Sequence, residues 1–144
     1  MIGRRTQVSA QAQADYLADV ALAANFDELL KAATAAEQRF RQAQATAAPD
    51  SVQYPLARTL DEALTEVMRA AYAARRAEIG PSGYEDRIYR RKAMATPAVH
   101  AWTDEAERLL TLRETHRLTG MPPRPLAAEA ADLPKARAFG PSAA

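Results

Sequence analysis

One short stretch of the chain, YEDRIYRRK, gathers the side chains best suited to binding. If the stretch is helical, Arg87, Arg90 and Arg91 fall on neighbouring positions of one face, and Tyr89 and Lys92 lie in the same stretch. Arginine forks bind carboxylates and phosphates, and a tyrosine ring stacks on a nucleobase or on a guanidinium group. The spacing therefore predicts a binding surface, whose partner is a protein, a nucleic acid or a small acidic ligand.

Two acids inside the same stretch bear on which partner is favoured. Asp86 stands four residues before Arg90, which is the spacing of a helical ion pair, and Glu85 precedes it. Both carboxylates would repel a phosphate backbone. The whole chain has 19 basic and 18 acidic residues, whereas dedicated polyanion binders carry a strong basic excess. A self-paired, solvated face or a protein contact is therefore favoured over a nucleic-acid site.

The histidines and the acidic clusters do not predict a catalytic or metal site. His100 and His116 are sixteen residues apart on one expected helix, about 24 Å along its axis, so they cannot share a metal ion. We expect both histidines to be exposed or partly packed on a polar face. Acids such as Glu62 fall near a helix start, where they offset the macrodipole. We therefore predict no catalytic residue, cofactor or metal. A further alternative, an enzyme with a pocket inside the helical bundle, would need Glu62, Glu66 and His100 to face inward.

Helical periodicity covers most of the chain, and no stretch alternates as a half-buried strand does. A first helix is expected from Ser9 to Ala24 and a second from Phe26 to Ala47. They meet at Asn25, which is expected to form a capping box with Glu28. The stripes expected to face the core are Leu17, Val20, Ala21 and Ala24 in the first helix and Phe26, Leu29, Leu30, Ala33, Ala36, Phe40 and Ala43 in the second.

Proline marks the start of the second half of the chain. The segment from Pro49 to Pro55 is predicted to be a loop. Thr59 is predicted to open a third helix through a capping box with Glu62, and Gly80 is predicted to end it after Ile79. The stripe of this helix is Leu60, Leu64, Val67, Met68, Ala71 and Ala74.

Two further helices are expected beyond a turn at residues 81–83. A short basic helix covers residues 84–95, and Pro97 at the first helical position opens the last long helix, which closes near Thr119. The stripe of the last helix is Val99, Trp102, Ala106, Leu109 and Arg113. The predicted fold is therefore all-α, with four to five helices in an antiparallel bundle or an open helical array.

The chain changes character after Gly120. Five of its nine prolines follow this residue, so residues 121–144 are expected to form an extended Pro-rich tail. Residues 1–120 are expected to form a single helical domain. The tail is expected either to be disordered or to lie along a partner's surface, with Pro122, Pro123, Arg124 and Pro125 as its predicted contacts.

Alanine dominates the apolar content, which limits the size of the core. The chain has 35 alanines, while Leu, Ile, Val and Phe together number 24 of its 144 residues. Alanine is the best helix former but buries little area, so helices form readily around a modest core. Such a chain is expected to complete its core against another chain. Trp102 is expected in the core or, alternatively, as an anchor in that interface.

These patterns lead to one expectation about function and one alternative. We expect a non-catalytic accessory or interaction subunit that binds another protein, or a second copy of itself, through alanine-rich helix faces and the tail. It would belong to a bacterial multi-subunit enzyme or to a phage or mobile-element assembly. The alternative is a small helical DNA- or RNA-binding protein that uses the arginine cluster. The predicted partner-binding residues are Arg87, Tyr89, Arg90, Arg91, Trp102, Pro122, Pro123, Arg124 and Pro125.

Composition also bears on location. The chain contains no cysteine, which excludes disulfides, thiolate zinc sites and cysteine nucleophiles. No apolar run approaches the roughly 18 residues that a membrane helix needs. The first ten residues carry two arginines without an apolar segment after them, unlike a secretory signal. A cytoplasmic protein without a membrane-spanning segment is expected.

Overall fold

The structure of the protein is a computed structural model that describes residues 7–124. Within this range it has five α-helices and no strand, so the all-α prediction is confirmed there. The helices are α1 (Ala10–Ala23), α2 (Phe26–Ala45), α3 (Asp50–Ile79), α4 (Arg87–Ala93) and α5 (Pro97–Thr115). A 3₁₀ turn, η1 (Pro81–Tyr84), precedes α4, and a π turn, η2 (His116–Gly120), follows α5. The part of the predicted tail from Pro125 onward lies outside the described residues.

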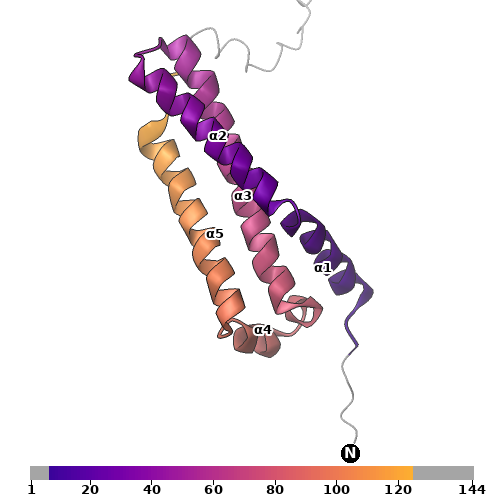
Figure 1. The fold of residues 1–144 in the computed structure, drawn as a ribbon. Coiled ribbons are helices and arrows are strands. Elements are labelled where there is room, and N and C mark those ends of the chain that lie inside the picture. Colours follow the sequence, from indigo (N-terminus) through magenta and orange to yellow (C-terminus); the bar gives the residue numbers. More distant parts are fainter. Residues whose placement is uncertain (1–6, 125–144) are drawn as a thin grey trace, which may run out of the picture.

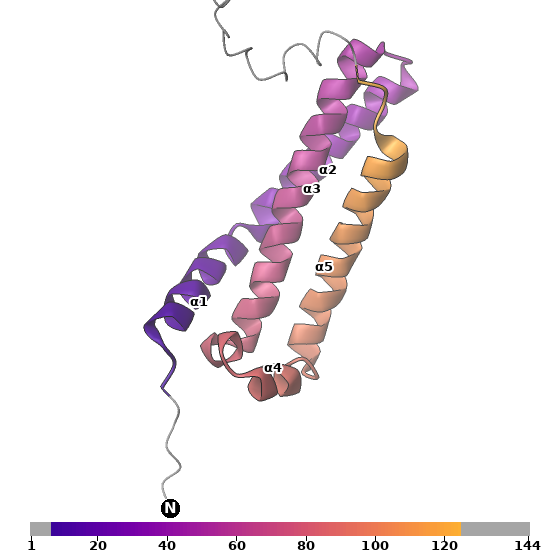
Figure 2. The same ribbon diagram turned by 180° about the vertical axis from the view of Figure 1, so that it is seen from behind.

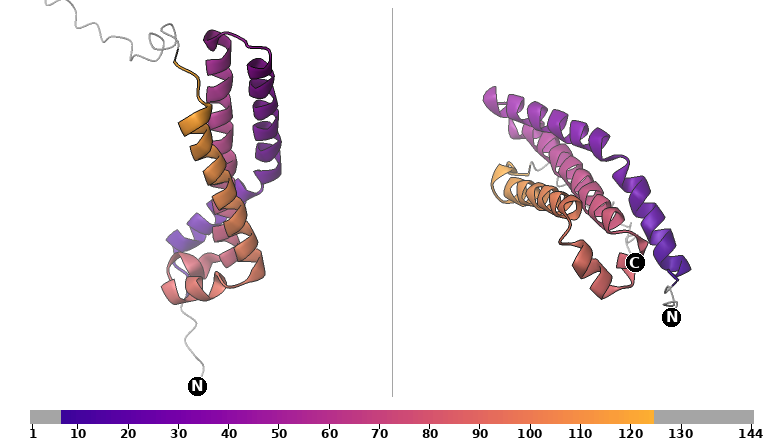
Figure 3. Two further views of the ribbon diagram at one scale, coloured as in Figure 1. Left: turned by 90° about the vertical axis from the view of Figure 1, so that its left-hand side faces the viewer. Right: turned by 60° about the horizontal axis from the view of Figure 1, so that its bottom comes forward.

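The long helices run back and forth beside one another. α1 and α2 run one way with a bend between them, α3 runs back along both, and α5 returns beside α3 (Figure 1; Figure 2 shows the same from behind). The 30 residues of α3 span about 45 Å, and this helix packs against α1, α2 and α5. The left view of Figure 3 shows α3 between α2 and α5. α3 is therefore the helix on which the other long helices pack.

Small side chains fill much of the core. Seventeen apolar residues are buried between residues 7 and 124, and ten of them are alanine. Nine of the buried residues lie on α3, in agreement with its central place. The apolar stripes predicted for α2, α3 and α5 are confirmed, with Phe40, Leu64 and Leu109 among their larger buried members.

α1 packs through a different face from the one predicted. Ala12 is its buried residue, and Asp19 lies against α3, where Arg76 binds it. The residues of the predicted stripe are exposed instead: Leu17, Val20, Ala21 and Ala24. The small side chain of Ala12 allows α3 to approach closely, and the ion pair sets the orientation of α1. Together these contacts outweigh the burial of two larger apolar side chains.

A side-chain cap explains where α1 begins, but no such cap is found at the start of α2. Ser9 caps α1, because its Oγ accepts a hydrogen bond from the Ala12 amide at 3.1 Å. Asn25 lies at the predicted joint, but its side chain makes no capping hydrogen bond, so the predicted capping box is wrong. Glu28 pairs with Lys31 at 3.2 Å instead, in the first turn of α2.

α2 ends in a tight turn that leads into α3. Ala47 has a φ of 51°, in the left-handed region that glycine usually occupies at this position. Its amide donates to the Gln44 carbonyl at 3.0 Å, and the Ala48 amide donates to the Ala43 carbonyl at 2.9 Å. These are the paired bonds of a Schellman motif. α2 therefore ends at Ala45, slightly before the predicted end.

The segment predicted as a loop, from Pro49 to Pro55, is the beginning of α3. Pro49 takes the N-cap position and Pro55 lies inside the helix. A proline at that place removes one amide hydrogen bond and costs a helix interior about 3 kcal/mol. Burial of the residues just beyond it, beginning with Ala57, offsets this cost. Thr59 lies inside the helix and donates to the Pro55 carbonyl at 3.0 Å, so the loop and the capping box with Glu62 are both wrong predictions.

Candidate binding surface at α4

Two glycines direct the chain from α3 into α4. Gly80 follows α3 with a φ of 96°, which favours glycine. Gly83 lies so close to Ile79 that a Cβ atom built on it would stand 2.3 Å from the Ile79 Cγ2 atom. The chain therefore turns tightly beneath the end of α3, and α4 lies at that end of the molecule (Figure 1).

Asp86 caps α4 instead of pairing with Arg90. Its Oδ1 accepts hydrogen bonds from the amides of Ile88 and Tyr89, at 3.0 and 2.9 Å. Arg90 donates from its Nε to a carbonyl of η1 at 2.8 Å. The predicted ion pair is wrong because the free amides of a helix start lie closer to the carboxylate. The cap also makes α4 shorter than the helix predicted over residues 84–95.

The segment before α1 lies against the same corner of the molecule. Glu85 accepts hydrogen bonds from the Ser9 hydroxyl and from the Ser9 amide, the latter at 3.1 Å. These bonds hold the pKa of the Glu85 carboxyl below its ordinary value. A groove of about 860 Å³ lies between this segment and α4, and Val8, Ile88 and Tyr89 supply its apolar lining.

The α4 surface consists of Arg87, Ile88, Tyr89, Arg91 and Lys92, all of which are exposed. Ile88 is 70 % exposed and Tyr89 is 46 % exposed. None of the three cations forms an ion pair with any residue from 7 to 124. The described chain buries no residue of α4. Ile88 is absent from the predicted set, although an aliphatic side chain inside an arginine run was a signal for it.

The other predicted partner-binding residues lie elsewhere. Trp102 on α5 is half-buried and meets Phe26 edge-to-face, with ring centroids 5.0 Å apart. Pro122 is half-buried, while Pro123 and Arg124 are exposed. This end of the described chain lies beside the α2–α3 connection, at the opposite end of the molecule from α4 (Figure 1). The predicted residues therefore do not form one continuous surface.

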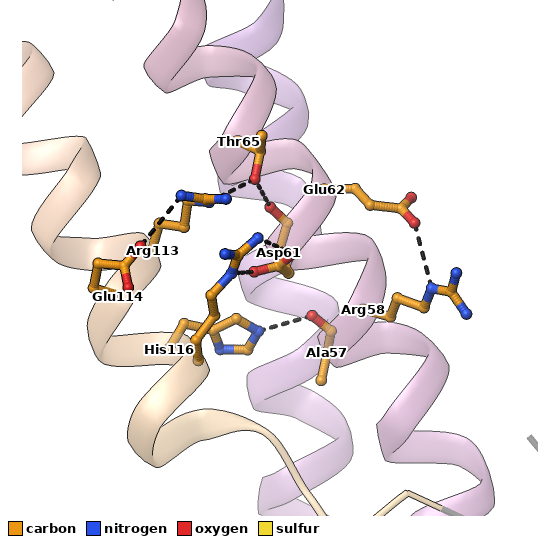
Figure 4. Close-up of polar contacts among 9 residues, drawn as sticks. Ala57, Arg58, Asp61, Glu62, Thr65, Arg113, Glu114 and His116 are labelled. Carbon is orange, nitrogen blue, oxygen red and sulfur yellow. Dashed lines mark hydrogen bonds and ion pairs between the residues drawn. The ribbon is translucent and has the colours of Figure 1, made fainter. Parts of the chain in front are cut away.

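His116 lies in the wall of a second hollow, between α2, α3 and η2. This hollow has a volume of about 310 Å³, with Phe40 and Leu112 in its apolar lining. His116 is only 8 % exposed, and its Nε2 donates to the Ala57 carbonyl at 2.8 Å (Figure 4). Its ring meets Phe40 edge-to-face. The expectation of a histidine on a polar face is wrong, because the carbonyl satisfies the polar atom that burial would otherwise leave without a partner.

Arginines on α5 and η2 join these elements to α3. Arg117 donates to Asp61 from Nε at 2.6 Å and from Nη2 at 3.2 Å. Arg113 donates to the Thr65 hydroxyl at 2.8 Å (Figure 4). The hydrogen bonds from Arg117 lower the pKa of Asp61, against the raising effect of burial. Asp61 therefore holds η2 on α3.

α1 is held by a cluster of three side chains. Arg76 on α3 donates to Asp19 on α1 from Nε at 2.8 Å and from Nη2 at 3.0 Å, and the Tyr84 hydroxyl donates to the same carboxylate. Burial acts to raise the pKa of Asp19, but the hydrogen bonds from Arg76 and Tyr84 and the charge of Arg76 outweigh it and lower the pKa. Burial and the bond to Asp19 raise the pKa of Tyr84. The cluster joins α1 to the corner that carries α4.

Stability is expected to fall in acid because Asp19 and Asp61 both have lowered pKa values. Each folded-state pKa lies below the ordinary value of 3.8, so near that pH the unfolded chain binds more protons. The contribution of each carboxylate is complete above about pH 4 and is lost as the pH falls through the folded-state pKa. Urea unfolding at a series of pH values measures this dependence. The double variant Asp19→Asn/Asp61→Asn is expected to depend less on pH, and an unchanged slope would contradict the assignment.

The residues that an enzyme with a bundle pocket would need are on the surface. Glu62, Glu66 and His100 are all exposed. Glu62 pairs with Arg58 at 3.5 Å (Figure 4), and His100 lies 3.2 Å from Asp104. Among residues 7–124, no group of three or more His, Asp or Glu side chains is placed to hold a metal ion. These three side chains therefore do not line a pocket within the bundle, as that enzyme hypothesis required.

Comparison of the chain with protein-family models, with curated proteins and with solved structures found no match. No helix in the described part of the chain has the length and apolar character that crossing a membrane requires. Function is therefore inferred from the surfaces that residues 7–124 present.

Proposed function

We propose that this protein is a non-catalytic interaction subunit that binds another protein. The partner covers the apolar side chains that this chain leaves exposed. The α4 surface, the alanine-rich helix faces and the Pro-rich segment that begins at Pro122 supply the contacts. The helices form an open array that is suited to such contacts. The protein acts in the cytoplasm as an accessory component of a larger assembly, either a bacterial multi-subunit enzyme or a phage or mobile-element assembly.

The balance of large apolar side chains is the observation that carries this proposal. Of the seventeen buried apolar residues in the described range, ten are alanine, which leaves seven larger ones. Eight large apolar side chains are exposed over the same range. Single exposed apolar residues are ordinary in monomers. A chain that exposes as many large apolar side chains as it fully buries gains free energy from a partner that covers them.

The exposed apolar residues fall mainly on three parts of the molecule. They are Leu17 and Val20 on α1, Ile88 and Tyr89 on α4, and Leu112 and Leu118 on α5 and η2. Of the three pairs, Ile88 and Tyr89 both line the groove beside α4, and contiguous apolar exposure is what distinguishes an interaction site from a scattered surface. The pair on α4 differs from the others because cations surround it.

Nucleic-acid binding is the second candidate function. The observation in its favour is that Arg87, Arg91 and Lys92 have no acidic partner in the described structure. Cations of this kind bind phosphates. The neighbouring Ile88 has no role in a phosphate contact, and for this reason a protein partner is favoured.

Affinity purification of the tagged full-length chain from its native source, followed by native mass spectrometry, tests the proposal. We expect a complex with a second protein in fixed stoichiometry. Nuclease treatment before purification separates a direct protein contact from a shared nucleic acid. Recovery of the chain only as a monomer or only as a homo-oligomer would contradict the proposal.

A further inference from the structure

We propose that the α4 surface binds an acidic protein segment that carries large apolar side chains. This inference rests on the proposed function, because it names the partner chemistry of one surface of that interaction subunit. Two observations carry it: the excess of positive charge on α4, and the exposed apolar pair with its groove.

Positive charge is concentrated on α4. This helix contains Arg87, Arg90, Arg91 and Lys92 and no acid, whereas the whole chain has 19 basic and 18 acidic residues. Glu85 and Asp86, which precede α4 and line the same groove, keep their negative charge and offset only part of this positive charge, and Arg87, Arg91 and Lys92 form no ion pair within residues 7–124. A partner that complements this charge is therefore acidic.

The apolar part of the α4 surface favours a partner that carries large apolar side chains as well as negative charge. Ile88 and Tyr89 are the exposed apolar side chains of α4, and both line the groove of about 860 Å³. Val8 lines the same groove from the segment before α1. A large apolar side chain of the partner that enters this groove is removed from water together with these three residues. Tyrosine and arginine are the residue types that most often dominate such contacts.

A protein segment fits these features better than a nucleic acid does. Cations alone account for phosphate binding, and an aliphatic side chain such as Ile88 adds nothing to it. In an acidic and apolar peptide, by contrast, the carboxylates reach Arg87, Arg91 and Lys92 while the apolar side chains cover Ile88. The charges set the rate of association and its sensitivity to salt, and the apolar contacts slow dissociation.

Fluorescence anisotropy with the full-length chain tests this inference. The probe is a fluorescein-labelled peptide of glutamate and aspartate with leucine and phenylalanine at helical spacing. One control peptide has serine in place of the apolar residues, and a second has lysine in place of the acids. We expect the first peptide to bind, with an affinity that falls between about 50 and about 200 mM salt, and both controls to bind at least about tenfold more weakly.

Variants of the chain locate the contact. Arg87→Glu/Arg91→Glu and Ile88→Ser are each expected to weaken binding at least about tenfold. Arg39→Glu on α2 and Val52→Ser near the start of α3 replace exposed residues of the same types far from α4 and are expected to leave binding unchanged. Circular dichroism confirms that each variant is folded. This is expected because the described chain buries none of the replaced side chains.

Three results would overturn the inference: no binding of the acidic and apolar peptide, equal binding by the α4 variants, or tighter binding of a single-stranded DNA of similar length. The native assembly separates this inference from the proposed function. If the α4 variants retain the stoichiometric partner, the proposed function stands and the inference fails. If the wild-type chain has no partner but binds the peptide through α4, the inference stands and the proposed function fails.

Discussion

Replacement of Leu109 by alanine is expected to lower the free energy of unfolding by about 3 kcal/mol. Leu109 is 1 % exposed and belongs to the buried cluster that includes Leu64 and Val67. Ten of the seventeen buried apolar residues are alanine, so few large side chains can move into the space that the variant leaves. The cost is therefore expected to lie well inside the range of about 2 to 5 kcal/mol for such replacements. Urea unfolding followed by circular dichroism measures it.

Leu112→Ala is the matched control, because Leu112 lies on the same helix and is 42 % exposed. This variant is expected to lose less than about 1 kcal/mol, since little apolar area returns to water. Similar losses in the two variants would contradict the packing of α5 on α3 described above.

Replacement of Asp19 by alanine is expected to free α1 from the rest of the molecule. The carboxylate receives two hydrogen bonds from Arg76 and one from Tyr84, and Ala12 is the only residue of α1 that the described chain buries. A helix of 14 residues is marginal in water without tertiary contacts. Loss of charged hydrogen bonds worth about 2 kcal/mol would speed amide exchange in α1 about thirtyfold. Hydrogen–deuterium exchange with mass spectrometry measures the rate.

Asp15→Ala is the control for this variant, because Asp15 lies on the same helix but is exposed and bonds only to Gln11. Amide exchange in α1 is expected to change little when Asp15 is replaced. Faster exchange in α5 as well as in α1 after replacement of Asp19 would show that the cluster supports the whole fold. Unchanged exchange in α1 would show that other contacts hold this helix.

The helices with large apolar side chains at regular spacing were predictable. The stripes through Phe40, Leu64 and Leu109 are buried as expected, because each spans several turns and has no competing apolar face. Two of the breakers were also reliable, since Gly80 follows α3 and Pro97 opens α5, whereas Pro55 lies inside α3. Gly80 and Pro97 act through their own backbone geometry, which needs no tertiary partner.

Predictions failed where small or polar side chains had several possible partners. In α1, alanine occurs on every side, so Leu17 and Val20 suggested a face that the ion pair between Asp19 and Arg76 turns away from α3. The sequence spacing predicted that Asp86 pairs with Arg90, but Asp86 caps α4 instead. In each case the choice depends on residues far apart in the chain or on the geometry of a turn.

The position of the candidate site in the chain was predictable from the sequence, but the groove that forms part of it was not. The arginine run marked the region of α4, and the structure shows its cations exposed and without ion pairs in the described residues. The groove beside Ile88 could not be predicted, because Val8 comes from a segment some eighty residues earlier. Trp102 and the Pro-rich segment were grouped with α4 by residue type alone, but Trp102 packs on Phe26, and the segment after η2 lies at the opposite end of the molecule from α4.

The sequence by itself determined that the described part of this protein is helical and which faces of α2, α3 and α5 are buried, because helix propensity and apolar spacing act within a few turns of one helix. Only the tertiary structure decided that α1 turns its leucine and valine outward, that Pro55 lies within a helix and that His116 is buried. These outcomes depend on the sum of contacts between helices that are distant in sequence. The free energy of these contacts between helices is larger than the conformational preference of any single residue, and the contacts can be read only from the packed structure.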